Sequence, residues 1–568
     1  MPPDNANIAR HLDLMAASQP LTAALKIPRG RTRTGDIDYL TLTFAELAAE
    51  VSAWRAQLTT RGIVPGDRVL VMVKPGLPLI AAAFALFAHG AVPIVIDPGM
   101  GLKSFLSCVT RSRPRALLGI PFARFISRVF RKPFATVQVR IPASSSPTAR
   151  LKPKPHVPNP NSQIETSSPS ALAAILFTSG STGAPKGVCY THGMFDAQVE
   201  LIRATYDIRP GEIDLPLLPL FALFNPALGM TTVVPEIDPS RPAAVDPKKI
   251  IQAIRQENIT SSFGSPTLWR KLAVHCHQHH VTLPSLRRVL CAGAPVPPDL
   301  WDLMTPVLPN GHLHSPYGAT ESLPVSTISA SEILVDTAVA TQNGAGTCVG
   351  RPLPANDVRI IALTDAPLAT LADTTQLPPG QIGEIIVAGP TVTHEYDALP
   401  EATAAAKIRD SGLEFGSLAF GTSHAVFHRL GDAGYIDANG YLWFCGRKAE
   451  RVETVAGPVF TEQVEPIFNT HADVRRSALI GLGERGRQRL AVVIEPVSPS
   501  FTADSTNCRR FARELREIAK RHAHTAHIKL FYFHPAFPVD VRHNAKIHRL
   551  TLATWAQTAT GYESDPKR

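Results

Sequence analysis

The sequence predicts an α/β fold, with a large N-terminal domain of layered α/β sheets and a small, mobile α+β domain at the C-terminus. Residues from about 10 to 445 alternate apolar strand-like runs with helical patterns, as chains with largely parallel sheets do. The chain has 568 residues, which is more than one hydrophobic core usually organises. We therefore expect two domains, residues 1–446 and residues 447–568.

One apolar stretch, from Leu77 to Ile96, is long and uncharged enough to resemble a membrane-spanning helix. Pro78, Gly90 and Pro93 interrupt it. They divide it into a short alanine-rich helix and a Val-Pro-Ile-Val-Ile strand, which is typical of a buried pair inside an α/β domain. We therefore predict no transmembrane segment.

The pattern changes after Arg447. Two apolar runs, Ala478–Gly481 and Leu490–Ile494, flank a glycine-containing turn and predict a strand hairpin. Cys508–His522 has apolar residues on one helical face, and Ile528–Phe533 predicts another strand. This alternation indicates a small lid-like α+β domain.

The most informative motif is the loop Phe177–Gly187, which is rich in glycine and hydroxyl residues. Ile175–Phe177 predicts a buried strand before it, and His192–Tyr206 predicts a helix after it, so backbone N–H groups can converge on an anion. Gly187 follows Lys186, so the loop lacks the Gly-Lys-Ser/Thr of the common phosphate motif. A flexible surface turn is the alternative interpretation.

Further motifs follow in order along the chain. They are Ala292–Pro295, Tyr317–Glu321, Leu430–Asp432, Gly446–Arg447 and Asn544–Lys546. With the loop, they resemble the ordered motifs of the adenylate-forming enzymes, which include acyl-CoA synthetases, luciferases and nonribosomal adenylation domains. The resemblance extends over about residues 40 to 550 and implies the fold of that superfamily, with ATP and Mg²⁺ as cofactors.

The resemblance also implies which residues bind ATP. Those expected around its pyrophosphate portion are Thr178, Ser179, Gly180, Ser181, Thr182, Gly183 and Lys186. Those expected around adenine are Gly293, Ala294, Pro295, Tyr317 and Gly318. Asp432 and Arg447 are expected at the ribose, because a carboxylate can accept hydrogen bonds from both hydroxyls of a vicinal diol. A turn residue and a surface ion pair are the alternatives for these two.

Four residues have implied catalytic roles. Thr320 would contact the α-phosphate, and Glu321 would hold Mg²⁺, a hard cation that prefers carboxylate oxygen. Lys186 would bind the leaving pyrophosphate. Lys546 would bridge the attacking carboxylate and the α-phosphate.

Three segments carry a closer resemblance. Leu220–Gly229, Phe444–Thr454 and Phe537–Ile547 are similar to the β-lactone synthetases of bacterial long-chain olefin biosynthesis. That family is implied to use ATP to close a long-chain 2-alkyl-3-hydroxyalkanoic acid into a four-membered lactone, without coenzyme A. The implied partners are a thiolase-like condensing enzyme, a reductase and a β-lactone decarboxylase.

Three positions near the expected hinge depart from the acyl-CoA ligase pattern. They are Ala449, Glu453 and Ala456, with Gly457 one residue late. A β-carbon at residue 456 could obstruct a thiol arm, which favours attack by the 3-hydroxyl that the substrate already carries. A fatty acyl-CoA or acyl-AMP ligase and a non-catalytic scaffold are the alternatives.

The base for that hydroxyl is not identified by the sequence. His192 matches a position where the superfamily often has histidine, but a packed structural role is an equal interpretation. Ala222 stands where many relatives have histidine, so Phe221 is predicted only to line the acyl or nucleotide entrance.

The net charge of +10 comes from one segment. No acidic residue lies between Asp97 and Glu165, where twelve basic residues occur, and the rest of the chain has 45 basic and 47 acidic residues. Phe122–Lys132 mixes aromatics with arginines, which is typical of surface helices near anionic lipid or acyl chains. We expect peripheral membrane or partner contact; the alternative is a solvated helix with a basic Pro/Ser-rich linker at residues 141–170. No recognised module accompanies the charge, so nucleic-acid binding is not predicted.

The seven cysteines are scattered, odd in number and without a CxxC pair. This usage favours reduced thiols in a cytoplasmic compartment. The N-terminus, Met1–Asn5, opens no signal peptide. We therefore expect a cytoplasmic protein.

Overall fold

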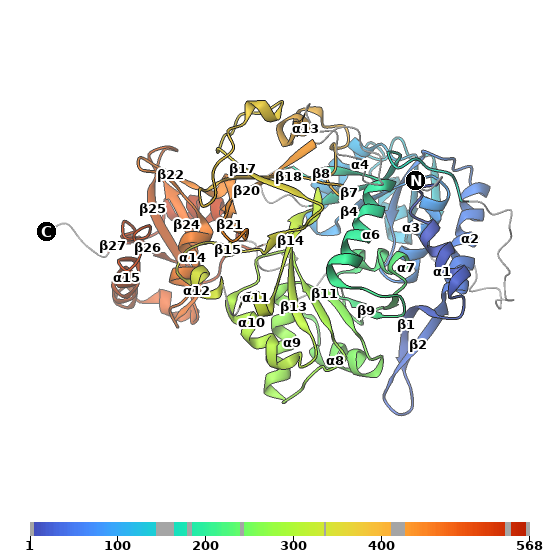
Figure 1. The fold of residues 1–568 in the computed structure, drawn as a ribbon, viewed down its shortest axis with the longest axis horizontal. Helices are drawn as coiled ribbons and strands as arrows, with labels where there is room; N and C mark the ends of the chain where they lie inside the picture. The colour runs from blue at the N-terminus through green and yellow to red at the C-terminus, as the bar shows by residue number, and fades with distance from the viewer. Residues whose placement is uncertain are drawn as a thin grey trace.

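The computed structural model describes residues 5–143, 164–178, 184–238, 244–333, 337–410, 426–539 and 547–563 (Figure 1). Within these residues the N-terminal part contains a nine-stranded sheet and two six-stranded sheets, and the C-terminal part contains a four-stranded sheet and a two-stranded hairpin. The layered α/β prediction is confirmed. Figure 1 shows the C-terminal elements, in orange to red, grouped at one end of the molecule.

The nine-stranded sheet has a parallel centre. Its order is β16-β14-β13-β12-β11-β9-β10-β1-β2, and the strands from β13 to β1 run parallel. The bounds are β1 (Ala23–Arg31), β2 (Ile37–Thr43), β9 (Ile213–Pro216), β10 (Thr231–Val233), β11 (Ser261–Gly264), β12 (Arg288–Cys291), β13 (His312–Ala319), β14 (Ser322–Ser329) and β16 (Arg351–Pro352). Helices α8 (Pro247–Gln256), α9 (Pro266–Gln278) and α10 (Pro298–Met304) pack on this sheet around the fully buried Trp269.

The first six-stranded sheet has the order β6-β5-β3-β4-β7-β8. Its strands are β3 (Arg68–Met72), β4 (Val92–Ile96), β5 (Ala116–Gly119), β6 (Val139–Pro142), β7 (Leu172–Thr178) and β8 (Lys186–Thr191). Helices α3 (Leu77–Ala88), α4 (Leu102–Ser112), α5 (Pro121–Val129) and α6 (His192–Tyr206) contact its strands. Helix α2 (Phe44–Thr60) packs between α3 and strands β1 and β2 of the nine-stranded sheet, and α1 (Arg10–Ser18) packs on α2. The apolar stretch at residues 77–96 forms helix α3 and strand β4, as predicted. Among the described helices, none is long and apolar enough to cross a bilayer.

The helix predicted at His192–Tyr206 is confirmed as α6. The sequence did not predict β8, which lies between the glycine-rich loop and α6 and runs antiparallel to β7. Residues 187–190 are all buried, so the strand has no alternation of buried and exposed positions. A short strand without that alternation cannot be separated from a loop by periodicity.

The second six-stranded sheet is antiparallel and supplies Asp432 and Arg447. Its strands are β15 (Thr347–Cys348), β17 (Asp357–Ile361), β18 (Gly383–Ala388), β19 (Lys407–Arg409), β20 (Val426–Ile436) and β21 (Leu442–Arg447). Short helices in the large part include η1 (Pro98–Met100), η3 (Pro219–Leu223), α7 (Asn225–Leu228), η5 (Thr305–Val307), α11 (Ala330–Glu332), α12 (Ala338–Gln342), η7 (Leu371–Asp373) and α13 (Pro400–Ala406).

The C-terminal part has its own core, which includes Val464, Phe511 and Phe531. Its elements are η8 (Lys448–Glu450), β22 (Val452–Thr454), β23 (Gly457–Val459), α14 (Thr461–Phe468), β24 (Val474–Leu482), β25 (Arg489–Pro496), α15 (Ser505–Ala519), β26 (Leu530–Phe533), α16 (Arg549–Ala556) and β27 (Tyr562–Glu563). The predicted hairpin is β24–β25. The predicted helix starts three residues earlier, because the Asp504 side chain accepts a hydrogen bond from the Thr506 N–H and caps it.

Candidate functional site

Several motif residues lie at one edge of the nine-stranded sheet. Strands β12 and β13 are parallel, with Arg288 opposite His312, so the residues that follow them emerge at the same carboxyl edge. Ala292–Pro295 follow β12, and Thr320–Glu321 form the turn between β13 and β14. Gly293 has φ +97°, a value that glycine adopts readily. Open α/β sheets bind ligands at this edge, so both segments lie where a ligand is expected.

Strand register brings Asp432 and Arg447 together. β20 and β21 pair with Asp432 opposite Arg447, and Arg447 Nη1 donates to Asp432 Oδ1 at 2.7 Å. Tyr317 Oη donates to Asp432 Oδ2 at 2.6 Å. The Asp432 carboxylate raises the pKa of Arg447, whereas burial, together with the same carboxylate, raises the pKa of Tyr317. We call these three residues the Asp432 cluster.

The Tyr317–Gly318 segment packs closely against its surroundings. The Tyr317 ring centroid lies 6.1 Å from that of Phe444 on β21. A β-carbon on Gly318 would collide with the carbonyl oxygen of Ser322. The hairpin therefore requires glycine at residue 318, and the Asp432 hydrogen bond and the Phe444 contact hold the neighbouring Tyr317.

Three contacts hold the Thr320–Glu321 turn. Tyr396 Oη donates to Glu321 Oε1 at 2.7 Å, and the Thr393 N–H donates to Glu321 O at 2.8 Å. Tyr190 Oη, on β8, donates to the Thr320 carbonyl. Neither tyrosine belongs to a motif, and the sequence carries no signal that would have found them.

Two lysines lie around the Tyr396 ring. Lys186 Nζ lies 4.7 Å from the ring centroid, and Lys407 Nζ lies 5.8 Å from it. Lys186 is exposed, whereas Lys407 is buried and donates to the Thr393 carbonyl. Burial lowers the pKa of Lys407 to about 7; Glu321 opposes this shift and Lys186 adds to it. Lys186, Glu321, Tyr396 and Lys407 are called the Glu321 cluster below.

Part of the predicted site lies outside the described residues. These positions are Ser179, Gly180, Ser181, Thr182, Gly183 and Lys546. Thr178 ends β7 and pairs in register with Lys186 at the start of β8, so the loop joins these two strands. β8 also meets Tyr396 through a bridge at Val188. The loop therefore begins and ends beside the Glu321 cluster.

Glu321 has the chemistry of a Mg²⁺ ligand. Magnesium is usually bound by one or two carboxylates together with substrate phosphates and water. Among the described residues, no group of three or more His, Cys, Asp or Glu side chains could hold a metal. A single carboxylate is too few ligands to hold Mg²⁺ alone, but it can bind a Mg²⁺ ion that is also held by substrate phosphates, and the two lysines attract those phosphates. The residues therefore fit Mg²⁺ bound together with ATP.

His192 and Phe221 both make packing contacts. His192 Nδ1 accepts from the Ile8 N–H at 3.2 Å, its ring lies 6.2 Å from Phe87, and burial lowers its pKa to about 4. These contacts favour the packed structural interpretation of His192. Phe221 stacks on Phe263 of β11 with ring centroids 3.6 Å apart. It lies just after β9, near the carboxyl edge that carries the motifs.

The positions that depart from the ligase pattern follow Arg447. Ala449 lies in η8, and Glu453 Oε1 accepts from Arg451 Nε at 2.5 Å. Ala456 is exposed in the turn between β22 and β23, where its N–H donates to Thr454 Oγ1 at 3.1 Å. Obstruction of a thiol arm by Ala456 stays a prediction, because these contacts do not test it.

Arg549 ties the chain after Lys546 to the segment after Arg447. Its Nε and Nη2 donate to the two carboxylate oxygens of Glu465 at 2.8 and 2.7 Å. Its Nη1 donates to Glu450 Oε2, in η8, at 2.9 Å. The start of α16 is thereby fixed on η8 and α14.

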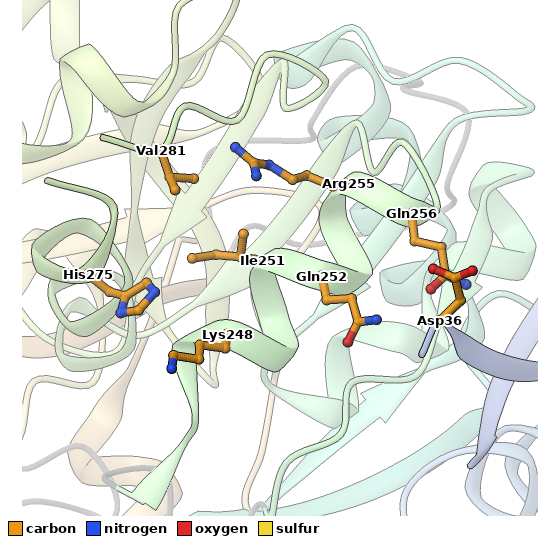
Figure 2. Close-up of a pocket in the computed structure, with 8 residues that line it drawn as sticks. All are labelled: Asp36, Lys248, Ile251, Gln252, Arg255, Gln256, His275 and Val281. Carbon is orange, nitrogen blue, oxygen red and sulfur yellow. The ribbon is translucent and has the colours of Figure 1, made fainter. Parts of the chain in front are cut away.

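An open pocket of about 520 Å³ lies elsewhere, on α8 and α9 (Figure 2). The residues that line it are Asp36, Lys248, Ile251, Gln252, Arg255, Gln256, His275 and Val281. None of them belongs to a motif or to either cluster. The pocket is therefore separate from the candidate site.

The sequence matches the model of a known protein family over most of the large part. The family model for AMP-binding enzymes matches residues 20–397, which include both β12–β14 and the Glu321–Tyr396 contact. The chain belongs to the AMP-binding enzyme family. AMP-binding enzymes of this kind are ATP-dependent and adenylate-forming and use Mg²⁺, so the resemblance inferred from the motifs is confirmed.

Relatives of known activity share nearly the whole chain. Olefin β-lactone synthetase from Xanthomonas campestris pv. campestris is 44% identical over 560 residues, covering 97% of each chain. The olefin β-lactone synthetase of Stenotrophomonas maltophilia is 44% identical over 559 residues, covering 97% of this chain and 98% of that one. A feruloyl-CoA synthase from Amycolatopsis is 29% identical over 464 residues, covering 80% of this chain and 83% of that one. The chain is thus more similar to the two synthetases than to this ligase.

Solved structures show the same fold. The amide bond synthetase McbA from Marinactinospora thermotolerans superposes with a TM-score of 0.75 at 23% identity, covering 97% of this chain and 99% of that one. The O-succinylbenzoate coenzyme A synthetase MenE from Bacillus subtilis, in complex with AMP, gives a TM-score of 0.72 at 21% identity, covering 98% and 99%. This AMP-binding enzyme therefore has the adenylate-forming fold along nearly its whole length.

Proposed function

We propose that this AMP-binding enzyme is an ATP-dependent β-lactone synthetase that acts on long-chain 2-alkyl-3-hydroxyalkanoic acids. The observation that carries the proposal is the 44% identity to two olefin β-lactone synthetases over 97% of the chain. The Asp432 and Glu321 clusters add support, because they give a nucleotide-binding enzyme the charges that adenylation needs.

In the first half-reaction, a carboxylate oxygen of the acid attacks the α-phosphorus of ATP and pyrophosphate leaves. Asp432 and Arg447 hold the ribose, and Tyr317 lies against adenine beside Gly293 and Ala294. The loop residues Thr178–Gly183 and Lys186 bind the pyrophosphate. The buried Lys407, close to Glu321, adds to the attraction for these phosphates when it is protonated.

Three further groups act at the α-phosphate in this proposal. Thr320 contacts it, and Lys546 places its ammonium group between it and the attacking carboxylate. Glu321 binds Mg²⁺, which neutralises phosphate charge when it is present. Tyr396 holds the Glu321 carboxylate in position through its hydroxyl.

In the second half-reaction, the 3-hydroxyl oxygen attacks the acyl-adenylate carbonyl. A C–O bond closes the four-membered ring, the bond between the acyl carbon and the phosphate oxygen of AMP breaks, AMP leaves with its electron pair, and the hydroxyl proton passes to a base. Intramolecular delivery favours this step, since well-oriented groups reach effective molarities on the order of 10⁵ M or more, although a strained ring realises less. His192 packs against Ile8 and Phe87 and is not assigned as that base.

Residues 447–568 act as the lid that carries Lys546, hinged at the segment after Arg447. The buried Arg549 contacts support this division, since they hold the start of α16 to elements on the C-terminal side of the hinge. We place the enzyme in the cytoplasm, together with a thiolase-like condensing enzyme, a reductase and a β-lactone decarboxylase.

Product analysis tests the proposal. Purified protein is incubated with ATP, Mg²⁺ and a 2-alkyl-3-hydroxy fatty acid, with and without coenzyme A, and the products are identified by NMR. Equal lactone formation in both reactions is expected. A thioester that forms only with coenzyme A would identify a fatty acyl-CoA ligase, and an acyl-adenylate as the end product would identify an acyl-AMP ligase.

A further inference from the structure

Helix α5 turns large apolar side chains toward solvent. Phe122, Phe125 and Val129 are 65%, 62% and 55% exposed, and their spacing places them along one face of the helix. The inner face carries the small residues Ala123 and Ser127, both buried. Single exposed apolar residues are ordinary, but a stripe of two phenylalanines and a valine on one helix marks an interaction surface.

The charge around this stripe is positive. Arg128, Arg131 and Lys132 are exposed, and the chain has no acidic residue between Asp97 and Glu165. Ion pairing does not remove this charge, since none of the described carboxylates lies within ion-pair distance of these three residues. We call Phe122, Phe125, Arg128, Val129 and Lys132 the α5 face.

Helix α4 begins near the same edge of its sheet. β4 and β5 both run parallel to β3, so α4 and α5, which follow them, start at the carboxyl edge of the sheet. Both helices pack on the same hydrophobic cluster, through Phe105 and Ile126. Leu102, at the start of α4, is 52% exposed and is followed by the exposed Lys103. A second apolar and basic pair thus lies at this edge.

We propose that the α5 face docks on an anionic lipid surface, with Phe122, Phe125 and Val129 among the acyl chains and the basic residues at the phosphates. An amphipathic helix that has aromatic residues beside Lys and Arg lies in the bilayer interface in this way. Lipid phosphates complement the uncompensated positive charge. A second copy of the chain fits less well, because an isologous contact would bring two basic surfaces together.

Docking does not depend on the proposed reaction, although it would bring the enzyme to a membrane where long-chain acids partition. The test is vesicle flotation of the purified full chain without ATP. Vesicles of phosphatidylcholine mixed with phosphatidylglycerol are compared with pure phosphatidylcholine, at about 0.1 M and about 0.5 M salt. Wild type is expected to float with the anionic vesicles, and less at the higher salt concentration.

Two double variants separate the apolar and basic contributions. Phe122→Ser/Phe125→Ser is expected to lower partitioning about tenfold or more, because two large apolar groups no longer insert. Arg128→Gln/Lys132→Gln is expected to lower it about tenfold on anionic vesicles and little on neutral ones. Leu21→Ser/Val64→Ser, which removes two exposed apolar side chains elsewhere, is the matched control and should float like wild type.

Several results would overturn the proposal. The first is that the wild-type protein does not float with anionic vesicles. The second is that the Phe122→Ser/Phe125→Ser variant floats as well as wild type. The third is that wild type forms a dimer without vesicles and that this variant does not, which would assign the face to a second copy of the chain. All variants are first checked for unchanged thermal unfolding and ATP–pyrophosphate exchange with a water-soluble hydroxy acid. That exchange separates a failure of docking from a failure of the proposed reaction.

Discussion

The Asp432 and Glu321 clusters balance their charges differently. In the Asp432 cluster, one buried carboxylate receives hydrogen bonds from Arg447 and Tyr317, so its charge is compensated before any ligand binds. In the Glu321 cluster, Lys186 and Lys407 lie around the ring of Tyr396, and the one carboxylate accepts from a neutral hydroxyl. The first cluster is nearly neutral in sum, whereas the second holds excess positive charge when both lysines are protonated.

This difference matches what each end of ATP requires. A ribose is neutral and needs preorganised hydrogen-bond groups, which a compensated carboxylate supplies without strong attraction for ions. A triphosphate is highly charged and gains most from cations in a partly desolvated site. Changes in the Glu321 cluster should therefore affect turnover, and changes in the Asp432 cluster should affect nucleotide binding.

The largest effect is expected for Glu321→Gln, which removes the carboxylate proposed to bind Mg²⁺. Adenylation should slow by about 10³-fold, because a neutral amide is a poor ligand for a hard cation. ATP–pyrophosphate exchange measured against Mg²⁺ concentration checks this. A wild-type Mg²⁺ dependence in the variant would refute the assigned role.

Lys546→Ala should slow adenylation by about 10²- to 10³-fold, the usual loss for one preorganised electrostatic group. This variant tests whether a residue of the C-terminal part, Lys546, adds to the positive charge that the Glu321 cluster provides for the phosphates of ATP. Lys520→Ala, which removes a surface ion pair with Glu517, is the control and should change the rate little. Unchanged pyrophosphate release from the Lys546 variant would contradict the role.

Asp432→Asn should raise KM for ATP by about 10- to 100-fold with a smaller change in kcat, since it weakens charged hydrogen bonds at the ribose. Asp357→Asn removes a carboxylate that pairs with an arginine on the same sheet and is the matched control. Steady-state kinetics with varied ATP measures both. A loss confined to kcat would reverse the contrast between the two clusters.

Lys407→Met should lower kcat for adenylation by about tenfold and stabilise the fold by about 1–3 kcal/mol near neutral pH, because it removes a buried charge from the Glu321 cluster. The pKa of Lys407 is about 7 when folded against an ordinary 10.5, so the native wild type binds fewer protons than the unfolded chain between these values. Wild-type stability should therefore rise relative to the variant as pH increases from about 7 to about 10.

Denaturant unfolding at several pH values measures this difference. Lys26→Met is the opposite control, because it leaves Glu257 without its ion-pair partner and should destabilise the protein. A stability difference between wild type and Lys407→Met that does not change with pH would show that Lys407 does not titrate in this range.

The smallest effect is expected for Tyr396→Phe, which removes one hydrogen bond to Glu321 and keeps the ring. Adenylation should slow by about threefold to tenfold, which corresponds to the loss of about 1 kcal/mol, the typical net contribution of one hydrogen bond. Tyr206→Phe removes a comparably buried hydroxyl that donates to Thr327 Oγ1 and not to Glu321, so it should leave the rate unchanged. Equal rates for the two variants would show that Tyr396 does not position Glu321.

The sequence by itself determined the features that local patterns encode. The division of residues 77–96 into α3 and β4 followed from proline and glycine placement, and the β24–β25 hairpin followed from two apolar runs around a turn. The ordered motifs also determined the family, because each consists of neighbouring residues whose types are fixed by nucleotide chemistry. Asp432 and Arg447 lie in two of these motifs, and the resemblance implied that both act at the ribose.

The tertiary structure alone decided what surrounds those motifs. Tyr396 reaches Glu321 from 75 positions away, and Tyr190 reaches Thr320 from 130 positions away. Lys407 looks like an ordinary basic residue in the sequence, and β8 like part of a loop, until packing buries them. Contacts of this kind depend on which elements meet when the sheets assemble, and local periodicity contains no information about such meetings between distant segments.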